Sequence, residues 1–296
     1  MKKIFLFFLL LFISSLSIYS LPPNTQAVVV DVKFDSEGNP TFFSNNKDYC
    51  NYYLFVTFSD VIGYDLSHNP YSTTVWRGER QLCKLRKNSD TSPSFRWSYA
   101  AYRGVPSPKL NLDFIYSFPV KSGDSIRASV AKNYSDFTLT FDLSFAGDTI
   151  YACREGCICD NKLTDQTFKG NMVNDRIIVY HKDDSFSEYS QFEKSLVYPG
   201  EYVKLGQPIA INTGKTLPKI ITFAVYYLDK NKVKNPETGN KYSHLVPVFH
   251  TLNAGDVKLE EDAVYIGEIN DNLLTQEMSA KEKKKYEKDK EKKQNK

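Results

Sequence analysis

The sequence predicts an all-β protein whose core is an antiparallel barrel or sandwich. Short apolar or alternating runs are separated by Gly, Pro and Asn turns, and the core segments show no helical period. The 20 Tyr and 20 Phe residues favour strands over helices. A chain of 296 residues is long enough for one large or two small domains with a sizeable core.

Residues 1–20 have the features of a secretory signal peptide. Lys2 and Lys3 precede the apolar run 4–13, and small residues lead to a cleavage site near Ser20. The apolar run is short for a membrane span, so an uncleaved anchor is the less favoured alternative. No later stretch is long and apolar enough to cross a bilayer. We therefore expect an exported chain, in the periplasm, at the cell surface or secreted.

Residues 21–130 predict an N-terminal β-rich domain, with strands at 27–32, 52–58, 95–102 and 112–120. The dipeptide Gly38-Asn39 before a proline and the segment 121–124 mark turns. Cys50 and Cys83 flank the long connection 65–80. In an exported chain we predict a Cys50–Cys83 disulfide, with two buried thiols as the alternative.

Residues 131–230 predict a compact barrel made of short strands. We expect strands at 137–143, 146–152, 177–180, 185–192, 202–203, 209–211 and 220–227. Turn signals separate them at 183–184, 199–200, 206–208 and 212–214. These short strand segments show no helical period.

The order of these signals is more specific than their composition. Val179-Tyr180-His181 is followed by Val197-x-x-Gly200-x-x-Val203-x-x-Gly206-Gln207-Pro208-Ile209, then by Asn212-Thr213-Gly214 and the strand 220–225. This run resembles the core of the lysostaphin/LytM-type zinc metallopeptidases, which cut peptidoglycan cross-bridges. The resemblance spans nearly the whole mature chain, is strongest over 137–225, and implies a LytM-like barrel.

The resemblance implies a zinc site built from two His and one Asp, with a further His that handles the proton. In this chain those positions hold other residues. The metal-binding Asp falls on Thr140, or on Phe141 if no gap is allowed, the middle His on Gln191, and the final motif on Ile220 and Thr222. We therefore expect the metal ligands to be lost, with no catalytic residue and no cofactor, and these positions to line the old substrate groove.

Two residues remain as weak candidates for metal ligands, Asp142 and His181. Asp142 lies one or two positions from the expected ligand, so it requires a bulge to reach the site. His181 resembles a frame residue of the family. The other histidines are His68, His244 and His250, and the last two would share a strand face about 20 Å apart, too far for one metal.

The other reactive side chains favour structural roles. The Cys153, Cys157 and Cys159 spacing does not follow a standard zinc pattern, so disulfides or thiols are favoured over a structural zinc. Asp183 and Asp184 are predicted to form a solvated turn rather than the pair of catalytic carboxylates of a glycosidase. The chain has no Gly-x-Ser-x-Gly elbow, phosphate loop or dinucleotide fingerprint.

The C-terminal part adds a β extension over 231–270, with strands at 245–249 and 263–266, and a Lys-rich polar tail over 271–296. Residues 281–296 hold nine Lys against four acidic residues. Without this segment and the two leader lysines, the formal charge changes from +3 to −4, so the basic character belongs to the ends. The tail is expected to be a fluctuating helix or disordered, and nothing indicates nucleic-acid binding.

These observations favour an exported, non-catalytic cell-envelope protein that binds peptidoglycan or regulates a cell-wall hydrolase. One alternative is an active zinc metalloendopeptidase with rearranged ligands, using Asp142, His181 and one of the late histidines. A second alternative is a surface adhesin-like binding module.

Overall fold

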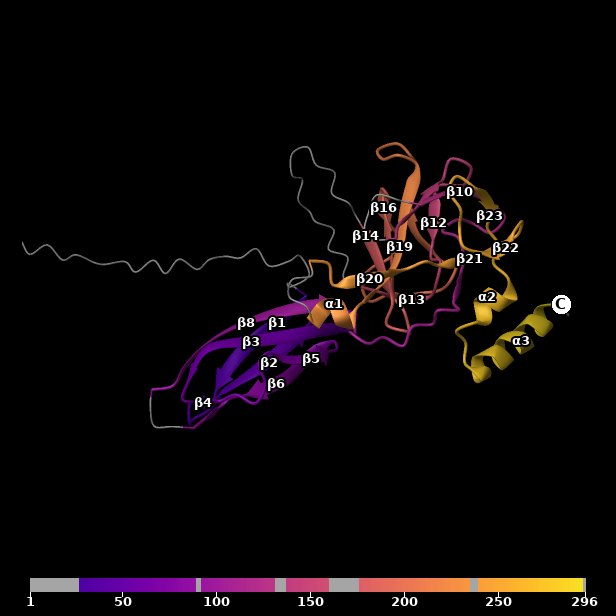
Figure 1. The fold of residues 1–296 in the computed structure, drawn as a ribbon. Coiled ribbons are helices and arrows are strands. Elements are labelled where there is room, and N and C mark those ends of the chain that lie inside the picture. Colours follow the sequence, from indigo (N-terminus) through magenta and orange to yellow (C-terminus); the bar gives the residue numbers. More distant parts are fainter. Residues whose placement is uncertain (1–26, 89–91, 131–136, 160–175, 235–238, 295–296) are drawn as a thin grey trace, which may run out of the picture.

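The computed structural model describes residues 27–88, 92–130, 137–159, 176–234 and 239–294. The predicted leader, 1–20, lies outside them. The described residues are mainly β, in several antiparallel sheets, which confirms the all-β prediction. Figure 1 shows an elongated N-terminal unit, indigo to purple, extending from a rounder body made of the later strands.

The N-terminal unit is a sandwich of two three-stranded sheets. Phe42 packs edge-on against Phe58 and Trp97 of the opposite sheet, with ring centroids 5.1 and 5.2 Å apart, so alternate residues of each strand fill the space between the sheets. A two-stranded ribbon lies at its end. The sheets are β1 (Val28–Phe34), β2 (Pro40–Asn46) and β6 (Gly78–Lys84); β5 (Tyr71–Val75), β3 (Tyr52–Ile62) and β8 (Ser94–Arg103); and the ribbon β4 (Tyr64–Asp65) with β7 (Arg86–Lys87).

The body, called the barrel below, is built around one large sheet whose strands differ in length. In spatial order its strands are β17 (Tyr202–Val203), β13 (Gly156–Ile158), β14 (Arg176–Tyr180), β15 (Phe186–Ser190), β19 (Ile220–Leu228), β11 (Leu139–Asp142), β10 (Ser125–Val130) and β23 (Val264–Ile266), with β20 (Tyr242–Leu245) also paired to β19. Two smaller sheets complete it. They are β12 (Thr149–Tyr151), β18 (Pro208–Ile211) and β16 (Lys194–Ser195), and β22 (Gly255–Val257), β21 (Val248–Thr251) and β9 (Ile115–Tyr116).

The two faces of the large sheet differ because side chains alternate along each strand. One face carries Phe141, Tyr189 and Phe223, all fully buried. Their rings pack against each other and against Phe249 of β21. The opposite face carries Thr140, Ser190 and Thr222, which are half-buried, and this second face holds the candidate site.

Two strands join the barrel although the sequence places them before it. β9 pairs with β21 in parallel, and β10 pairs with β11 and β23. The last strand of the two sandwich sheets is therefore β8, while β9 and β10, which lie within the expected N-terminal domain 21–130, pair with strands of the barrel. The expected strand 245–249 is also divided in two, because Pro247 lies between β20 and β21 and cannot donate a ladder hydrogen bond.

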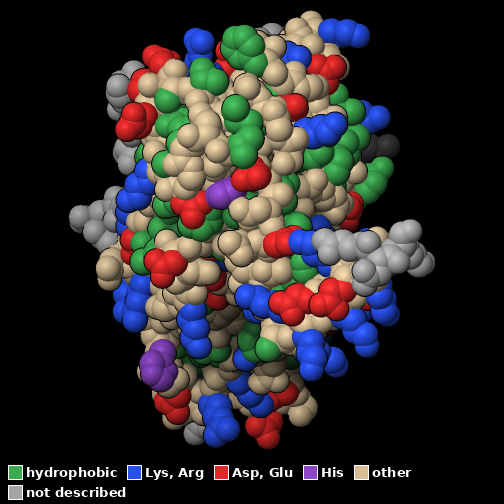
Figure 2. All heavy atoms as spheres, turned by 90° about the vertical axis from the view of Figure 1, so that its right-hand side faces the viewer, with side chains coloured by type: hydrophobic (Ala, Val, Ile, Leu, Met, Phe, Trp, Pro, Cys, Tyr) green, Lys and Arg blue, Asp and Glu red, His purple; other side chains and the backbone are tan. Residues whose placement is uncertain are grey.

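The C-terminal tail is helical in its described part. After the short α1 (Lys230–Lys234) earlier in the chain, α2 (Asp271–Thr275) begins at Asn270, whose side chain caps Leu273 N, and α3 (Ala280–Gln294) follows. Figure 2 shows the face on the right of Figure 1, where basic and acidic side chains are interleaved rather than gathered by sign. None of the helices in the described residues is long and apolar enough to cross a membrane.

The sandwich and the barrel meet at a surface called the junction below. Cys159, Ile178 and Phe186 of the barrel belong to the same buried apolar cluster as the sandwich core. Asn51 Nδ2 donates to the Tyr180 hydroxyl at 3.0 Å. Gly200 lies so close to Tyr49 that a Cβ atom there would be 2.3 Å from the Tyr49 ring. The junction therefore holds the two units in contact through packed, buried groups.

Candidate functional site

Three hydroxyl side chains form a row where the resemblance predicts zinc ligands. Thr140 on β11 lies opposite Thr222 on β19, and Ser190 on β15 lies opposite Thr222 on its other side. All three are half-buried and belong to the outer face of the large sheet. Neighbouring strands are about 4.8 Å apart, so the three hydroxyl side chains lie next to one another across β11, β19 and β15.

The other two expected groove positions lie at the edge of this row. Ile220 is two residues before Thr222 and shares its face. Gln191 follows the last residue of β15, has a positive φ of 74°, and its carbonyl accepts a hydrogen bond from Asn212 Nδ2 at 2.7 Å. The Gln191 turn therefore serves to end the strand.

Asp142 and His181, the two candidate ligands, are in different surroundings. Asp142 lies opposite Ile220 in a regular ladder, so it reaches the face of Thr140 without the expected bulge. Its carboxylate accepts from Ser144 N at 2.8 Å, and hydrogen bonding to the Ser144 side chain and backbone lowers its pKa. His181 is buried, with Nδ1 2.7 Å from the Glu155 carbonyl and Nε2 2.6 Å from Ser187 Oγ.

These residues do not fit a zinc ion. Zinc sites use His, Cys and carboxylate ligands that converge on one point, whereas the row offers hydroxyls beside an aliphatic and an amide side chain. All four histidines lie within the described residues. In the described part of the chain, three potential ligand atoms converge at Asp48, Cys50 and Cys159, and neither Asp142 nor His181 belongs to such a group.

The late histidines also differ from their prediction. His244 lies on β20 and His250 on β21, in separate sheets rather than on one strand. His250 contacts the carboxylates of Asp256 and Glu268 at 2.5 and 3.0 Å. Burial lowers its pKa, but these two carboxylates outweigh that effect and raise it above the ordinary value.

A polar groove runs along the outer face of the sheet beside the hydroxyl row. Glu188, Tyr226 and His244 line two adjoining cavities of about 180 and 240 Å³. One end reaches the junction and the other reaches the row. The further lining residues are Arg103, Arg176, Ile178, Asn240 and Tyr242 at the junction end, and Thr138, Ser190, Thr222 and Ala224 at the row end.

The groove carries both signs of charge. Arg176 NH1 lies 3.9 Å from Glu188 Oε2, and the Tyr226 hydroxyl donates to the same oxygen at 3.1 Å. Burial, with Glu188 nearby, raises the Tyr226 pKa well above its ordinary value, so this hydroxyl stays a donor. The groove can therefore hydrogen-bond to cationic, anionic and amide groups of a ligand.

Sequence reasoning missed Glu188, Tyr226 and His244. A usable signal existed for two of them, because residues two apart share a strand face. Glu188 therefore accompanies Ser190, and Tyr226 follows Thr222 and Ala224 on β19. His244 had no such signal, because its place depends on the pairing of β20 with β19.

A buried ion-pair centre lies apart from the groove lining. Arg154, whose side chain is 1% exposed, pairs with Asp183 at 3.1 Å and Glu277 at 2.7 Å. Burial would raise the pKa of Asp183, but Arg154 and the Ser185 hydroxyl lower it below the ordinary value. The prediction of a solvated Asp183 turn is therefore wrong: its carboxylate anchors Arg154, which also holds the segment before α3.

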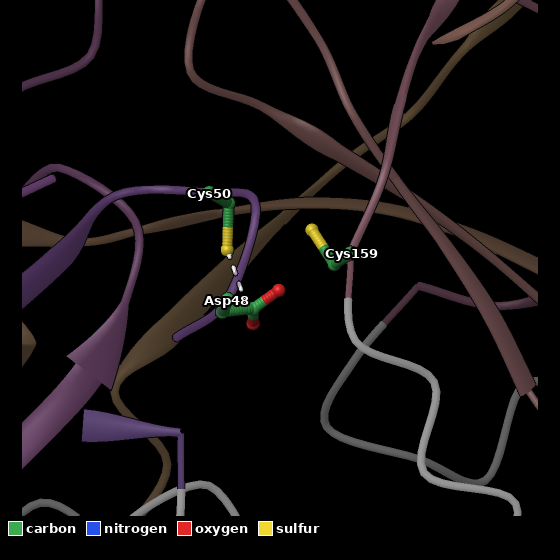
Figure 3. A group of neighbouring side chains, drawn as sticks. All are labelled: Asp48, Cys50 and Cys159. Atoms are coloured by element: carbon green, nitrogen blue, oxygen red, sulfur yellow. Dashed lines mark hydrogen bonds between the residues drawn. The ribbon is translucent and has the colours of Figure 1, made fainter. Parts of the chain in front are cut away.

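The predicted Cys50–Cys83 disulfide is not formed. All five cysteines are free thiols in the structure, and Cys83 lies half-buried on β6. Cys50 instead lies beside Asp48 of the same segment and faces Cys159 across the junction (Figure 3). Cys153, Cys157 and Cys159 do not converge, since Cys153 is in the barrel core and Cys159 in the junction cluster.

No family model matches the chain, and no curated protein matches it. Among solved structures, the chain is similar to a zinc-containing peptidase from Vibrio cholerae, with 10% identity over 66% of this chain and 81% of that chain, at a TM-score of 0.26. Helicobacter pylori Csd3 is similar in two crystal forms, both with 12% identity. The match to the hexagonal form covers 68% of this chain and 71% of that chain, at a TM-score of 0.26. The match to the orthorhombic form covers 90% of this chain and 82% of that chain, at a TM-score of 0.28. Similarity this low carries neither the activity nor the ligands of those proteins to this chain.

Proposed function

We propose that the chain is an exported, non-catalytic protein of the cell envelope whose groove binds the peptide part of peptidoglycan. The observation that carries this proposal is the polar groove of two adjoining cavities, which share Glu188 and Tyr226 and reach Ser190 and Thr222 of the hydroxyl row. It occupies the face where the resemblance to lysostaphin/LytM-type peptidases places the substrate, while the residues at the ligand positions do not fit zinc.

The chemistry of the groove supports a peptide ligand. Wall peptides carry carboxylates, ammonium groups and amides, and the groove offers an arginine, a carboxylate and several hydroxyls along one line. Arg176 is the matching partner for a carboxylate because its guanidinium can bind in a bidentate manner. Glu188 and the Tyr226 hydroxyl would bind ammonium and amide groups.

Titration of the mature chain with soluble wall peptides, followed by calorimetry, tests this function. Arg176→Ala and Glu188→Gln should each weaken binding about tenfold, since a hydrogen bond to a charged group contributes about 1.5–3 kcal/mol. The matched control is the exposed pair Lys33–Glu79 on the sandwich, at 3.4 Å. Lys33→Ala and Glu79→Gln should leave binding unchanged.

Absence of binding to wall peptides, or equal losses in the groove and control variants, would overturn the proposal. Binding to a purified cell-wall hydrolase without any binding to wall peptides would favour the regulatory role instead. Cleavage of wall peptides that is sensitive to chelators would favour the peptidase with rearranged ligands. Binding to host matrix alone would favour the adhesin-like module.

A further inference from the structure

Two cysteines from different units lie in contact at the junction. Cys50 precedes β3 in the sandwich, and Cys159 directly follows β13 in the barrel. Their sulfur atoms and an Asp48 carboxylate oxygen all lie within 4.8 Å of one another. Both thiols are buried, with 2% and 0% exposure. Figure 3 shows the two side chains approaching each other from separate parts of the chain.

We propose that Cys50 and Cys159 form a disulfide bond that joins the sandwich to the barrel. In oxidising compartments such pairs of contacting thiols are found as disulfides. In the bond the two sulfur atoms would lie about 2.05 Å apart. This pairing replaces the Cys50–Cys83 bond that the sequence suggests.

The backbone on each side of the pair is fixed, which favours one geometry. Asn46 Nδ2 donates to the Cys50 carbonyl at 2.9 Å, and Cys159 N donates to the Ile178 carbonyl at 2.9 Å. The neighbouring contact from Asn51 to Tyr180 holds the same two segments together. The cysteines therefore meet because the fold places them there.

The surroundings of Asp48, Cys50 and Cys159 favour a disulfide over a bound metal ion. The Asp48 carboxylate accepts from Arg103 Nε and NH2 at 3.2 and 2.9 Å and from the Tyr52 hydroxyl at 2.8 Å. It is therefore already neutralised. Metal binding also needs thiolates, whereas burial and the neighbouring Cys159 raise the Cys50 pKa well above its ordinary value.

The bond forms by exchange with a disulfide-carrying oxidant, such as a thiol–disulfide oxidoreductase or glutathione disulfide. Cys50 and Cys159 give up two electrons and two protons as their S–S bond forms. The S–S bond of the oxidant breaks and takes up those electrons and protons as two thiols. Because the Cys50 thiol is buried and protonated in the closed junction, exchange takes place while the junction is still open.

The bond would also stabilise one end of the groove. Asp48 accepts a hydrogen bond from the Cys50 thiol at 3.5 Å and pairs with Arg103, which lines the groove. Fixing the two units across Cys50 and Cys159 therefore fixes the groove wall that Arg103 supplies. Reduction should lower the melting temperature and increase proteolysis at the junction.

Peptide mapping of the full chain, secreted into an oxidising compartment and alkylated under denaturing conditions before and after reduction, tests the proposal, because denaturation exposes the buried thiols. We expect a linked peptide containing Cys50 and Cys159, while Cys83, Cys153 and Cys157 are alkylated without reductant. Cys50→Ser and Cys159→Ser should each abolish the linked peptide, and the control variants Cys83→Ser and Cys157→Ser should keep it.

Three results would overturn the proposal. They are alkylation of all five cysteines without reductant, a linked peptide that joins another pair, and protection of Cys50 and Cys159 that a zinc chelator removes. The mapping is performed on the wild-type chain, so it does not depend on the folding of any variant. It also does not depend on peptide binding by the groove.

Discussion

The groove and the junction differ in the kinds of side chains that the fold brings together. In the groove, β11, β15 and β19 place Thr140, Ser190 and Thr222 in one row, and none of them is a zinc ligand. At the junction, Cys50 and Cys159 converge with Asp48 although no sequence pattern links them. A strand framework and the chemistry of the side chains on it are thus separate properties.

The largest effect that separates the two regions should come from their arginines. Arg103, 6% exposed at its side chain, pairs with the buried Asp48 at 2.9 Å. Arg103→Ala should cost about 3–5 kcal/mol of unfolding free energy, because it leaves a buried carboxylate unpaired. Arg176→Ala in the groove, where the side chain is 43% exposed, should cost at most about 1 kcal/mol.

Urea unfolding of both variants at neutral pH measures this difference. The double variant Asp48→Asn, Arg103→Met is the control for the unpaired charge and should be more stable than Arg103→Ala. Equal and small losses in Arg103→Ala and Arg176→Ala would show that the junction is no more rigidly built than the groove.

The next effect concerns His181, a weak candidate ligand in the sequence and a buried side chain in the structure. Burial, together with Arg154, lowers its pKa from 6.5 to about 3. Below pH 6.5 the unfolded chain therefore takes up a proton that the folded chain does not. The His181 contribution is fully present above pH 6.5 and decreases as the pH falls towards 3, by up to about 1.4 kcal/mol per pH unit.

Unfolding free energies of wild type and His181→Gln at pH 7, 6 and 5 measure this effect. The wild type should lose more stability than the variant over that range. His250→Gln is a control of opposite sign, because the raised pKa of His250 gives a contribution that is present below its unfolded pKa and is lost as the pH rises. A parallel pH dependence of wild type and His181→Gln would place His181 in contact with solvent.

A smaller effect measures the junction packing alone. Gly200 and Gly123 both have positive φ, 89° and 96°, so an alanine is strained at either position. A Cβ at Gly200 would meet the Tyr49 ring, whereas one at Gly123 would meet nothing within 4 Å. Gly200→Ala should therefore cost about 1–2 kcal/mol more than Gly123→Ala in thermal unfolding. Equal costs would contradict close packing at the junction.

The sequence could predict the strand framework because strand periodicity and turn residues are local signals. The barrel strands β14, β17, β18 and β19 lie where the apolar runs and Gly or Pro turns place them. The expected strand 112–120 is reduced to β9, and the sandwich strand β2 was not foreseen, because its sequence contains Pro, Ser and Asn.

The rest of the site could not be predicted because it depends on long-range pairing. Cys50 reaches Cys159 only after β13 has paired with β14 and the sandwich has docked. His244 enters the groove only when β20 pairs with β19. The sequence predicts a solvated Asp183, because only the folded chain brings Arg154 into contact with its carboxylate. Such long-range contacts cannot be predicted from the local periodicity of the sequence.

Our central claim is that the chain keeps the strand framework but has lost the zinc ligands. The most direct test is the zinc content of the purified wild-type chain, measured by elemental mass spectrometry. The triple variant Thr140→Asp, Ser190→His, Thr222→His is the positive control, since its three new ligands would project from adjacent strands. We predict almost no zinc in the wild type and about one zinc per chain in the variant. About one zinc in the wild type that persists in Cys50→Ser, Cys159→Ser would contradict the loss of the metal site.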